Sequence, residues 1–359
     1  MKSKVYFIKV VQTDEVPRVQ AKLARLLRES KVLDWISEKD IAVIKMHFGE
    51  ERNVGHVLPE YVKVISDWVS NKKAIPILSD TNTLYRGRRT NSKDHSLLAC
   101  EHGFAPVRTG ARVVIPDDTK KENCAEVPIN QKFIKVAKIV KLFLEADALI
   151  DVAHFKGHLM TGFGGVLKNI GMGCATREGK LAQHSDISPV VDGENCIGCG
   201  ACEAVCPVSA ISLNKNNGKA NVDGKLCIGC ASCIAACDYQ AMVVNWAAGG
   251  DTIQEKMIEY TKAVLDSRKG KTAYINFAIK ITKECDCLAK DDPRISPDIG
   301  IFASLDPVSL DSACRDAVIA ECGRDIFKEL HPERDGNKQL QYAAKLGLGN
   351  LEYELIEVK

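Results

Sequence analysis

The chain has 359 residues, enough for two domains, and its 45% hydrophobic and 27% charged residues are ordinary for a globular protein. A net charge of +2 argues against a dedicated surface for nucleic acid or anionic membranes, and the sequence contains no apolar run of about 18 residues that would span a membrane. The first residues, MKSKVYFIKVVQTDE, lack the length and cleavage site of a signal peptide, so we expect a cytoplasmic protein.

Short strand-like runs alternate with helix-like stretches along most of the chain. Strands are predicted at residues 5–10, 41–48, 74–80, 111–117 and 148–155, with helices between them at 16–36, 58–73 and 91–104. After residue 245 follow a helix at 251–268, strands at 271–282 and 299–304, a helix that opens at Pro307 behind the N-cap Asp306, and the final run LEYELIEV. This alternation predicts an α/β fold with a doubly wound, mostly parallel sheet.

The alternation stops near Ser188, and residues 192–245 are rich in cysteine and glycine with few helix signals. We therefore expect one discontinuous α/β domain, residues 1–187 and 246–359, interrupted by a small inserted domain at residues 188–245. In a reducing compartment, clustered cysteines favour metal binding or catalysis over disulfides, and this chain has 15 of them.

Two copies of the pattern C-x₂-C-x₂-C-x₃-C lie in the insert. Their members are Cys196, Cys199, Cys202 and Cys206 in the first copy, and Cys227, Cys230, Cys233 and Cys237 in the second. Gly198, Gly200 and Gly229 permit the tight turns that such a ligand set needs. Two zinc sites are the alternative, but two complete runs that start 31 positions apart (227 − 196) favour iron–sulfur clusters.

The insert resembles a bacterial ferredoxin, a small α+β domain with two 4Fe-4S clusters. This resemblance implies that the fourth cysteine of each copy serves the other cluster. The implied ligand sets are Cys196, Cys199, Cys202 and Cys237 for one cluster, and Cys227, Cys230, Cys233 and Cys206 for the other.

Polar motifs follow four of the predicted strands, where ligands of open parallel sheets bind. They are HFGE (47–50), DTNTLYRGRR (80–89), HFKGH (154–158) and CDC (285–287). Taken singly, each motif can also be an ordinary polar loop. The candidate catalytic residues at this rim are His47, His154, Lys156, His158 and Lys168. His154 and His158 are four residues apart and can also be read as metal ligands, although Gly157 argues against a shared helix.

Two segments are candidates for binding a small anion. Asp80 with Arg86, Arg88 and Arg89 can hold a carboxylate or phosphate, or form a solvated face. The glycines of TGFGGVLKN, which are Gly162, Gly164 and Gly165, can turn backbone amides toward an anion or permit close packing. The segment is neither a Walker loop nor a dinucleotide fingerprint, so NAD or ATP is weakly supported.

Cys285 and Cys287 allow three interpretations. A mutual disulfide within C-x-C is strained, whereas two thiolates at this spacing can chelate a soft metal. A third centre would use this pair, with Cys174 and one histidine from His47, His154, His158 or His184 as partners. The pair can instead be a reactive dithiol or two structural cysteines.

Together these motifs resemble the domain-of-unknown-function 362 family in its ferredoxin-bearing form. The resemblance covers nearly the whole chain and rests on IKMHFGE (44–50), DTNTLYRGRR, HFKGHLMTGFGGVLKNIGMGC (154–174), the cysteine motifs, CDC and PDIGIFASLDPVSLDSA (297–313). It implies iron–sulfur binding and a discontinuous α/β host, but it supplies no reaction. A remote likeness to the lactate racemase fold is an analogy of fold alone.

Three functions fit these features. The first is a ferredoxin-coupled oxidoreductase, in which two 4Fe-4S clusters pass electrons to a rim site that holds a small anionic substrate. The second is an electron-transfer adaptor without its own catalysis, and the third is a protein that handles metallocofactors or sulfur. As partner we expect a protein electron donor or acceptor, and neither nucleic acid nor a membrane.

Overall fold

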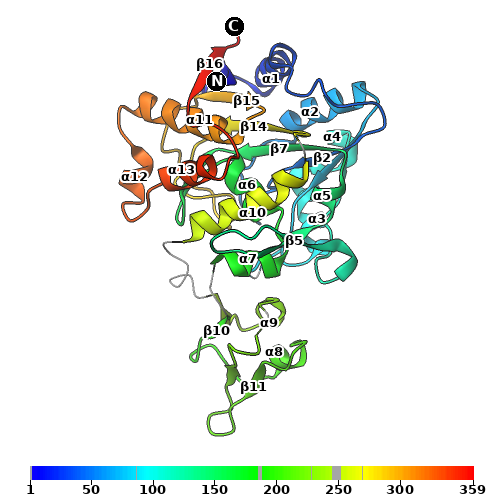
Figure 1. Cartoon of the computed structure of the whole chain (residues 1–359), viewed down its shortest axis with the longest axis vertical. Helices are drawn as coiled ribbons and strands as arrows, with labels where there is room; N and C mark the ends of the chain where they lie inside the picture. Colours follow the sequence, from blue (N-terminus) through cyan, green and yellow to red (C-terminus); the bar gives the residue numbers. More distant parts are fainter. Residues whose placement is uncertain (1, 86, 185–187, 228, 245–251, 269) are drawn as a thin grey trace.

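A computed structural model describes residues 2–85, 87–184, 188–227, 229–244, 252–268 and 270–359. Its main sheet has eight strands (Figure 1). In spatial order they are β16 (Tyr353–Glu357), β1 (Ser3–Lys9), β15 (Gly300–Ser304), β14 (Thr272–Ala278), β7 (Ala148–His154), β2 (Ile41–Lys45), β3 (Ile75–Ser79) and β4 (Arg112–Val113). Only β15 runs against its neighbours, so the prediction of an α/β fold with a mostly parallel sheet is confirmed.

Each central strand buries both of its faces. Along β7, Ile150 and Val152 pack into one apolar cluster, while Leu149 and Ala153 pack into another on the opposite side. Helices α1 (Val16–Ser30) and α2 (Pro59–Asn71) cover the first side, and α6 (Val166–Gly173), α10 (Ile253–Arg268) and α11 (Pro307–Cys322) cover the second (Figure 1). Near-continuous apolar strands are what a sheet covered on both faces requires.

Shorter elements connect this framework. The helices are α3 (Ser92–Ala99), a π-helix at Cys100–Phe104, α4 (Pro106–Thr109), a 3-10 helix at Lys121–Asn123, α5 (Leu142–Glu145), α7 (Arg177–His184), α12 (Ile326–Leu330) and α13 (Asn337–Lys345). Two hairpins join β5 (Cys124–Pro128) to β6 (Val136–Val140) and β8 (Lys156–His158) to β9 (Gly162–Gly164). The sequence did not predict either hairpin, and it predicted 91–104 as one helix where the structure has two segments.

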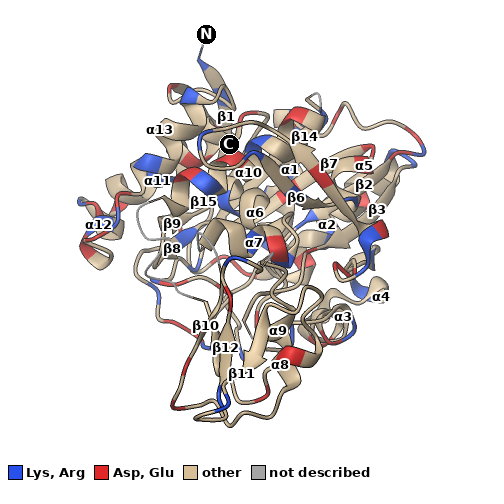
Figure 2. Ribbon diagram, turned by 60° about the horizontal axis from the view of Figure 1, so that its bottom comes forward, with Lys and Arg blue, Asp and Glu red and all other residues tan. Residues whose placement is uncertain are grey.

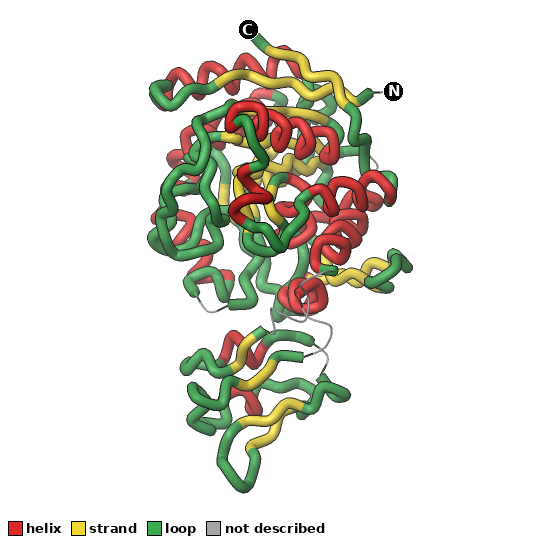
Figure 3. The backbone as a smooth tube through the Cα atoms, turned by 90° about the vertical axis from the view of Figure 1, so that its left-hand side faces the viewer, coloured by secondary structure: helices red, strands yellow, loops and turns green. Residues whose placement is uncertain are grey.

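The cysteine-rich segment forms small paired strands and two short helices below the main sheet in Figures 1 and 3. β10 (Val190–Val191) pairs with β13 (Met242–Val243), β11 (Ile211–Leu213) pairs with β12 (Ala220–Val222), and the helices are α8 (Ala201–Ala204) and α9 (Ser232–Ala236). The pairing of β10 with β13 places the start and the end of this segment side by side. Leu84 and Leu181 of the larger part belong to the same apolar cluster as the segment's buried residues.

Basic and acidic residues are interspersed in Figure 2, in keeping with the small net charge. Among the described residues, no helix has both the length and the apolar character needed to cross a membrane.

Candidate functional site

The loops that follow β14, β7, β2 and β3 meet at one edge of the sheet. These four strands are consecutive neighbours and all run parallel, so their carboxyl ends lie at the same edge. The polar motifs that the sequence placed after these strands therefore converge. We call this edge the rim.

Arg89 is the centre of one buried group at the rim, with only 2% of its surface exposed. Its Nε donates to Glu50 (3.1 Å), its Nη1 approaches His47 Nε2 (2.7 Å), and its Nη2 contacts the hydroxyl of Tyr85. Burial, followed by the charge of Arg89, holds the pKa of His47 well below its usual value. His47 is therefore a neutral imidazole beside a fixed positive charge.

Lys45 and Asp80 form a second buried pair, with 3.1 Å between Lys45 Nζ and Asp80 Oδ1. Lys45 Nζ also donates to Asn169 Oδ1 at 2.8 Å, which connects β2 to helix α6. Burial opposes ionisation of Asp80, but the nearby cations, Lys45 first, outweigh it and hold the Asp80 pKa below its usual range. A Cβ on Gly173 would overlap the Lys45 amine, so a side chain at this helix position would displace that amine.

Asp286 fixes the loop between the two rim cysteines. Its carboxylate pairs with Lys156 and lies 3.0 Å from His154 Nδ1. Burial alone would raise the pKa of Asp286, but Lys156 and His154 overcome that effect and lower it well below its usual value. The Tyr85 hydroxyl donates to the Cys287 carbonyl at 2.9 Å, so the loop is also attached to the Arg89 group.

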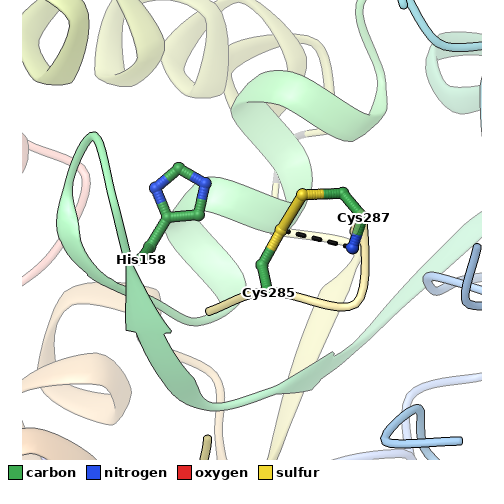
Figure 4. Close-up of side chains that lie close together, drawn as sticks. All are labelled: His158, Cys285 and Cys287. Atoms are coloured by element: carbon green, nitrogen blue, oxygen red, sulfur yellow. Dashed lines mark hydrogen bonds between the residues drawn. A yellow bond between two sulfur atoms is a disulfide. The ribbon is translucent and has the colours of Figure 1, made fainter. Parts of the chain in front are cut away.

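The Cys285 and Cys287 sulfurs are joined in a disulfide (Figure 4). The sequence led us to expect no mutual bond, and that expectation was wrong for a geometric reason. The loop doubles back at Asp286, which brings the two Cα atoms to 5.3 Å, within the ordinary range for a disulfide. The Cys287 amide also donates to Cys285 Sγ at 3.3 Å.

His158 lies beside this pair, and a donor atom from each of the three residues lies within 4.8 Å of the other two (Figure 4). Among the described residues, no other group of three or more His, Cys, Asp or Glu side chains is this close. Cys174, which we expected as a partner, is instead in the apolar core, where burial raises its thiol pKa. His154 is bound to Asp286 and the Ile279 carbonyl.

Lys168 brings a further positive charge to the rim from helix α6. Among the described residues, no hydrogen bond or ion pair joins its amine to a partner. Burial, followed by repulsion from Lys156 and Lys45, lowers its pKa to about 8. Lys180 has a pKa lowered to about 8 by burial as well, but its amine donates to Thr81 Oγ1 at 2.6 Å.

The structure differs in part from the two anion-binding segments that the sequence predicted. The amides of Val166 and Leu167 donate to Asp311 of helix α11, both at 3.0 Å, so they are not available to an external anion. A Cβ on Gly165 would overlap Asp311, and Gly162 and Gly164 belong to β9, which supports the close-packing interpretation of these glycines. Arg88 pairs with Glu101 and is only partly buried, and Arg86 lies outside the described residues.

The eight cysteines of the insert divide between two cavities. One cavity is lined by Cys196, Cys199, Cys202 and Cys237, and the other by Cys206, Cys227, Cys230 and Cys233. Each cavity thus takes three cysteines from one copy of the motif and the fourth from the other copy. Burial raises the pKa of the Cys233 thiol to about 12.

The two copies also repeat each other in backbone structure, with a shift of 31 positions (227 − 196). The Asp192 amide donates to the Ala241 carbonyl at 2.7 Å, and the equivalent Asp223 amide donates to Ala210 at 2.8 Å. Each half therefore binds the other in the same way.

Backbone amides approach the sulfurs in both halves. The Ala210 amide donates to Cys206 Sγ and the Ala241 amide to Cys237 Sγ, both at 3.2 Å. Left-handed backbone at Gly200 (φ 78°) and at its equivalent Ala231 (φ 59°) opens helices α8 and α9.

Sequence reasoning assigned no role to several residues that the structure places in the rim contacts. They are Lys45, Glu50, Tyr85, Asn169 and Asp286. Lys45 had a signal, because it is a charged residue within the apolar run IAVIKMHF. Asp286 had a weaker signal, because it is the acidic residue between Cys285 and Cys287.

Comparison with protein families finds that the model of a domain of unknown function, DUF362, matches residues 42–316. No curated protein matches the chain. Among solved structures, the chain is similar to the lactate racemase apoprotein from Thermoanaerobacterium thermosaccharolyticum, with 15% identity, a TM-score of 0.41, and coverage of 76% of this chain and 50% of the racemase.

A second similar structure is a protein from Thermotoga maritima, with 10% identity, a TM-score of 0.42, and coverage of 92% of this chain and 59% of that one. The chain thus spans between half and three-fifths of the length of these two proteins.

Proposed function

The chain belongs to the DUF362 family, and from this premise we propose that it is an electron-transfer protein whose inserted domain, residues 188–245, is a ferredoxin domain with two 4Fe-4S clusters. The observation that carries the proposal is the division of eight cysteines between two cavities, four to each. Crossed ligand sets of this kind are the arrangement of two-cluster ferredoxins.

The residues around both cavities suit such clusters. Four thiolates are the ligand set that a 4Fe-4S cluster takes, and amide hydrogen bonds to the sulfurs, as from Ala210 and Ala241, are among the features that set its potential. When bound, each cluster supplies a one-electron redox couple. Cys196, Cys199, Cys202 and Cys237 would hold one cluster, and Cys206, Cys227, Cys230 and Cys233 the other.

The rim is the proposed destination of these electrons, in a cytoplasmic oxidoreductase that acts on a small anionic substrate. The amine of Lys168 makes no ion pair with a described residue and lies among other cations, so it favours a negatively charged ligand. His47, His154, Lys156 and His158 are proposed to orient that ligand or exchange protons with it. A separate protein is proposed as electron donor or acceptor.

A metal ion at Cys285 and Cys287 is the second candidate, which would add a metal-handling role. The cluster of these cysteines with His158 favours it, because soft cations prefer thiolate and imidazole ligands. Only the reduced pair can supply thiolates, so this site depends on the redox state of the disulfide.

Iron and acid-labile sulfide, measured per chain after purification without oxygen, test the principal proposal. We expect about eight of each for two 4Fe-4S clusters. A Cys285→Ser/Cys287→Ser variant is the matched control, since it lies outside both cavities and should keep the same iron and sulfide. Zinc in place of iron, or a count that falls in this variant, would contradict the assignment of the clusters to the insert.

A further inference from the structure

We propose that His158, Cys285 and Cys287 form a redox-gated site for a thiophilic divalent cation, closed as the disulfide and open as the dithiol. The inference deepens the second candidate above and does not require the clusters to be present. It adds how the three donor groups are held together before an ion binds, and which redox step opens and closes the site.

The imidazole of His158 is held in place through one of its two nitrogens. Its Nδ1 lies 3.0 Å from Thr161 Oγ1, and the same hydroxyl donates to the Phe163 carbonyl at 2.7 Å. Nδ1 also accepts from the Met160 amide at 3.2 Å, so without an ion the ring proton is on Nε2. A cation at Nε2 requires this proton to move to Nδ1, where Thr161 Oγ1 is placed to accept it. Metal-binding histidines commonly have their second nitrogen engaged in this way.

The loop that carries the sulfurs is fixed against the strand that carries His158. The Gly157 amide donates to the Thr282 carbonyl at 3.0 Å, and a Cβ on Gly157 would overlap the Lys283 carbonyl. The Leu159 amide donates to Glu284 Oε2 at 3.1 Å. These contacts flank His158 on both sides, so the three donor atoms are brought together before any ion binds.

Opening the disulfide requires little movement of this framework. Zn–S bonds of about 2.3 Å put two thiolates of a tetrahedral site roughly 3.8 Å apart. The Cα atoms of the pair are 5.3 Å apart, which accommodates that separation by rotation of the two side chains. With His158 the protein supplies three ligands, and the fourth position is left for water or another ligand, as in zinc sites that perform chemistry.

The redox step uses an external dithiol as reductant. The Cys285–Cys287 bond breaks, the two sulfurs of the reductant join, and the two protons of the reductant pass to the protein sulfurs. Binding of a divalent cation then displaces these two protons. Oxidation of the pair reverses both changes and releases the ion.

Zinc bound per chain, measured by anaerobic equilibrium dialysis of the holoprotein, tests the proposal. The protein is first treated with dithiothreitol or with diamide, and the reagent is removed. We expect about one more zinc in the reduced form than in the oxidised form. His158→Gln should weaken this binding by more than tenfold, because loss of even an outer-shell partner costs roughly 10–100-fold. Cys285→Ser/Cys287→Ser should abolish it.

Two matched controls keep the test independent of folding and of the clusters. Cys322→Ser and His102→Gln remove the same chemical groups elsewhere and should leave the redox-dependent zinc unchanged. Iron and sulfide are counted in the same samples, so loss of the clusters is seen separately from loss of the rim site. Equal zinc in both redox states, or retention of the extra zinc by the double cysteine variant, would overturn the proposal.

Discussion

Lys168 is a half-buried cation of the rim whose amine makes no hydrogen bond or ion pair with another described residue. Its surroundings are positive, because Lys156 and Lys45 are the charges that most depress its pKa after burial itself. A buried charge without a counter-ion destabilises a fold, and such residues are typically retained for function. Removal of the Lys168 charge should therefore raise the stability of the fold and lower activity.

We expect Lys168→Met to raise the free energy of unfolding by about 1 kcal/mol, or Tm by roughly 2 °C, because it keeps the apolar stem and removes the uncompensated charge. The folded pKa of about 8 lies below the usual 10.5, so protonation opposes folding. The gain should be full below pH 8 and vanish as pH rises toward 10.5. Thermal unfolding across this range measures it, with exposed Lys345→Met as control, and a lower Tm would refute the argument.

At the scale of one element, Asp311 caps the start of helix α6. It reaches from helix α11 to accept the amides of Val166 and Leu167 at the start of α6, and it also accepts from Asn276 at 2.6 Å. Three donors thus converge on one carboxylate and join two helices to strand β14. Because α6 carries Lys168 and Asn169, this cap also sets the position of one side of the rim.

Asp311→Asn should destabilise the protein by about 1–3 kcal/mol, because an amide replaces one acceptor oxygen with a donor that faces another donor. Thermal unfolding gives the change, and Glu321→Gln, on the exposed face of the same helix, is the control. An Asp311→Asn protein with unaltered Tm would show that the cap contributes little.

The main strands and helices could be predicted from the sequence, but the contacts at the rim could not. Runs such as IAVIKMHF and ALIDVAHF are apolar on both faces, which only a covered sheet accommodates. The ion pair of Lys156 with Asp286 joins residues 130 positions apart, and it depends on β7 and β14 being neighbours. The β8–β9 hairpin likewise lies against residues far along the chain, because Gly157 is close to the Lys283 carbonyl, and no local pattern indicates this approach.

At the scale of the whole molecule, the crossed cysteine sets make each half of the insert depend on the other. Cys206 belongs to the first motif but lines the second cavity, and Cys237 does the reverse. If each cavity holds the proposed cluster, damage to one motif should therefore expose cysteines of the other motif.

Alkylation of cysteines, mapped by mass spectrometry on anaerobic protein, measures this dependence. In Cys206→Ser we expect Cys227, Cys230 and Cys233 to become reactive while the first cavity stays protected. Cys237→Ser should instead expose Cys196, Cys199 and Cys202. If each substitution exposed only the cysteines of its own motif, the crossed arrangement would be wrong.

The pairing of β10 with β13 has a consequence for how such a molecule can change over evolutionary time. It holds the two ends of the insert one strand spacing apart, about 4.8 Å. A segment attached in this way can be deleted or exchanged, because its removal leaves two chain ends that a short turn can bridge. The sheet that carries the rim contains no described strand from this segment, so its strand order and register do not depend on which segment occupies this position.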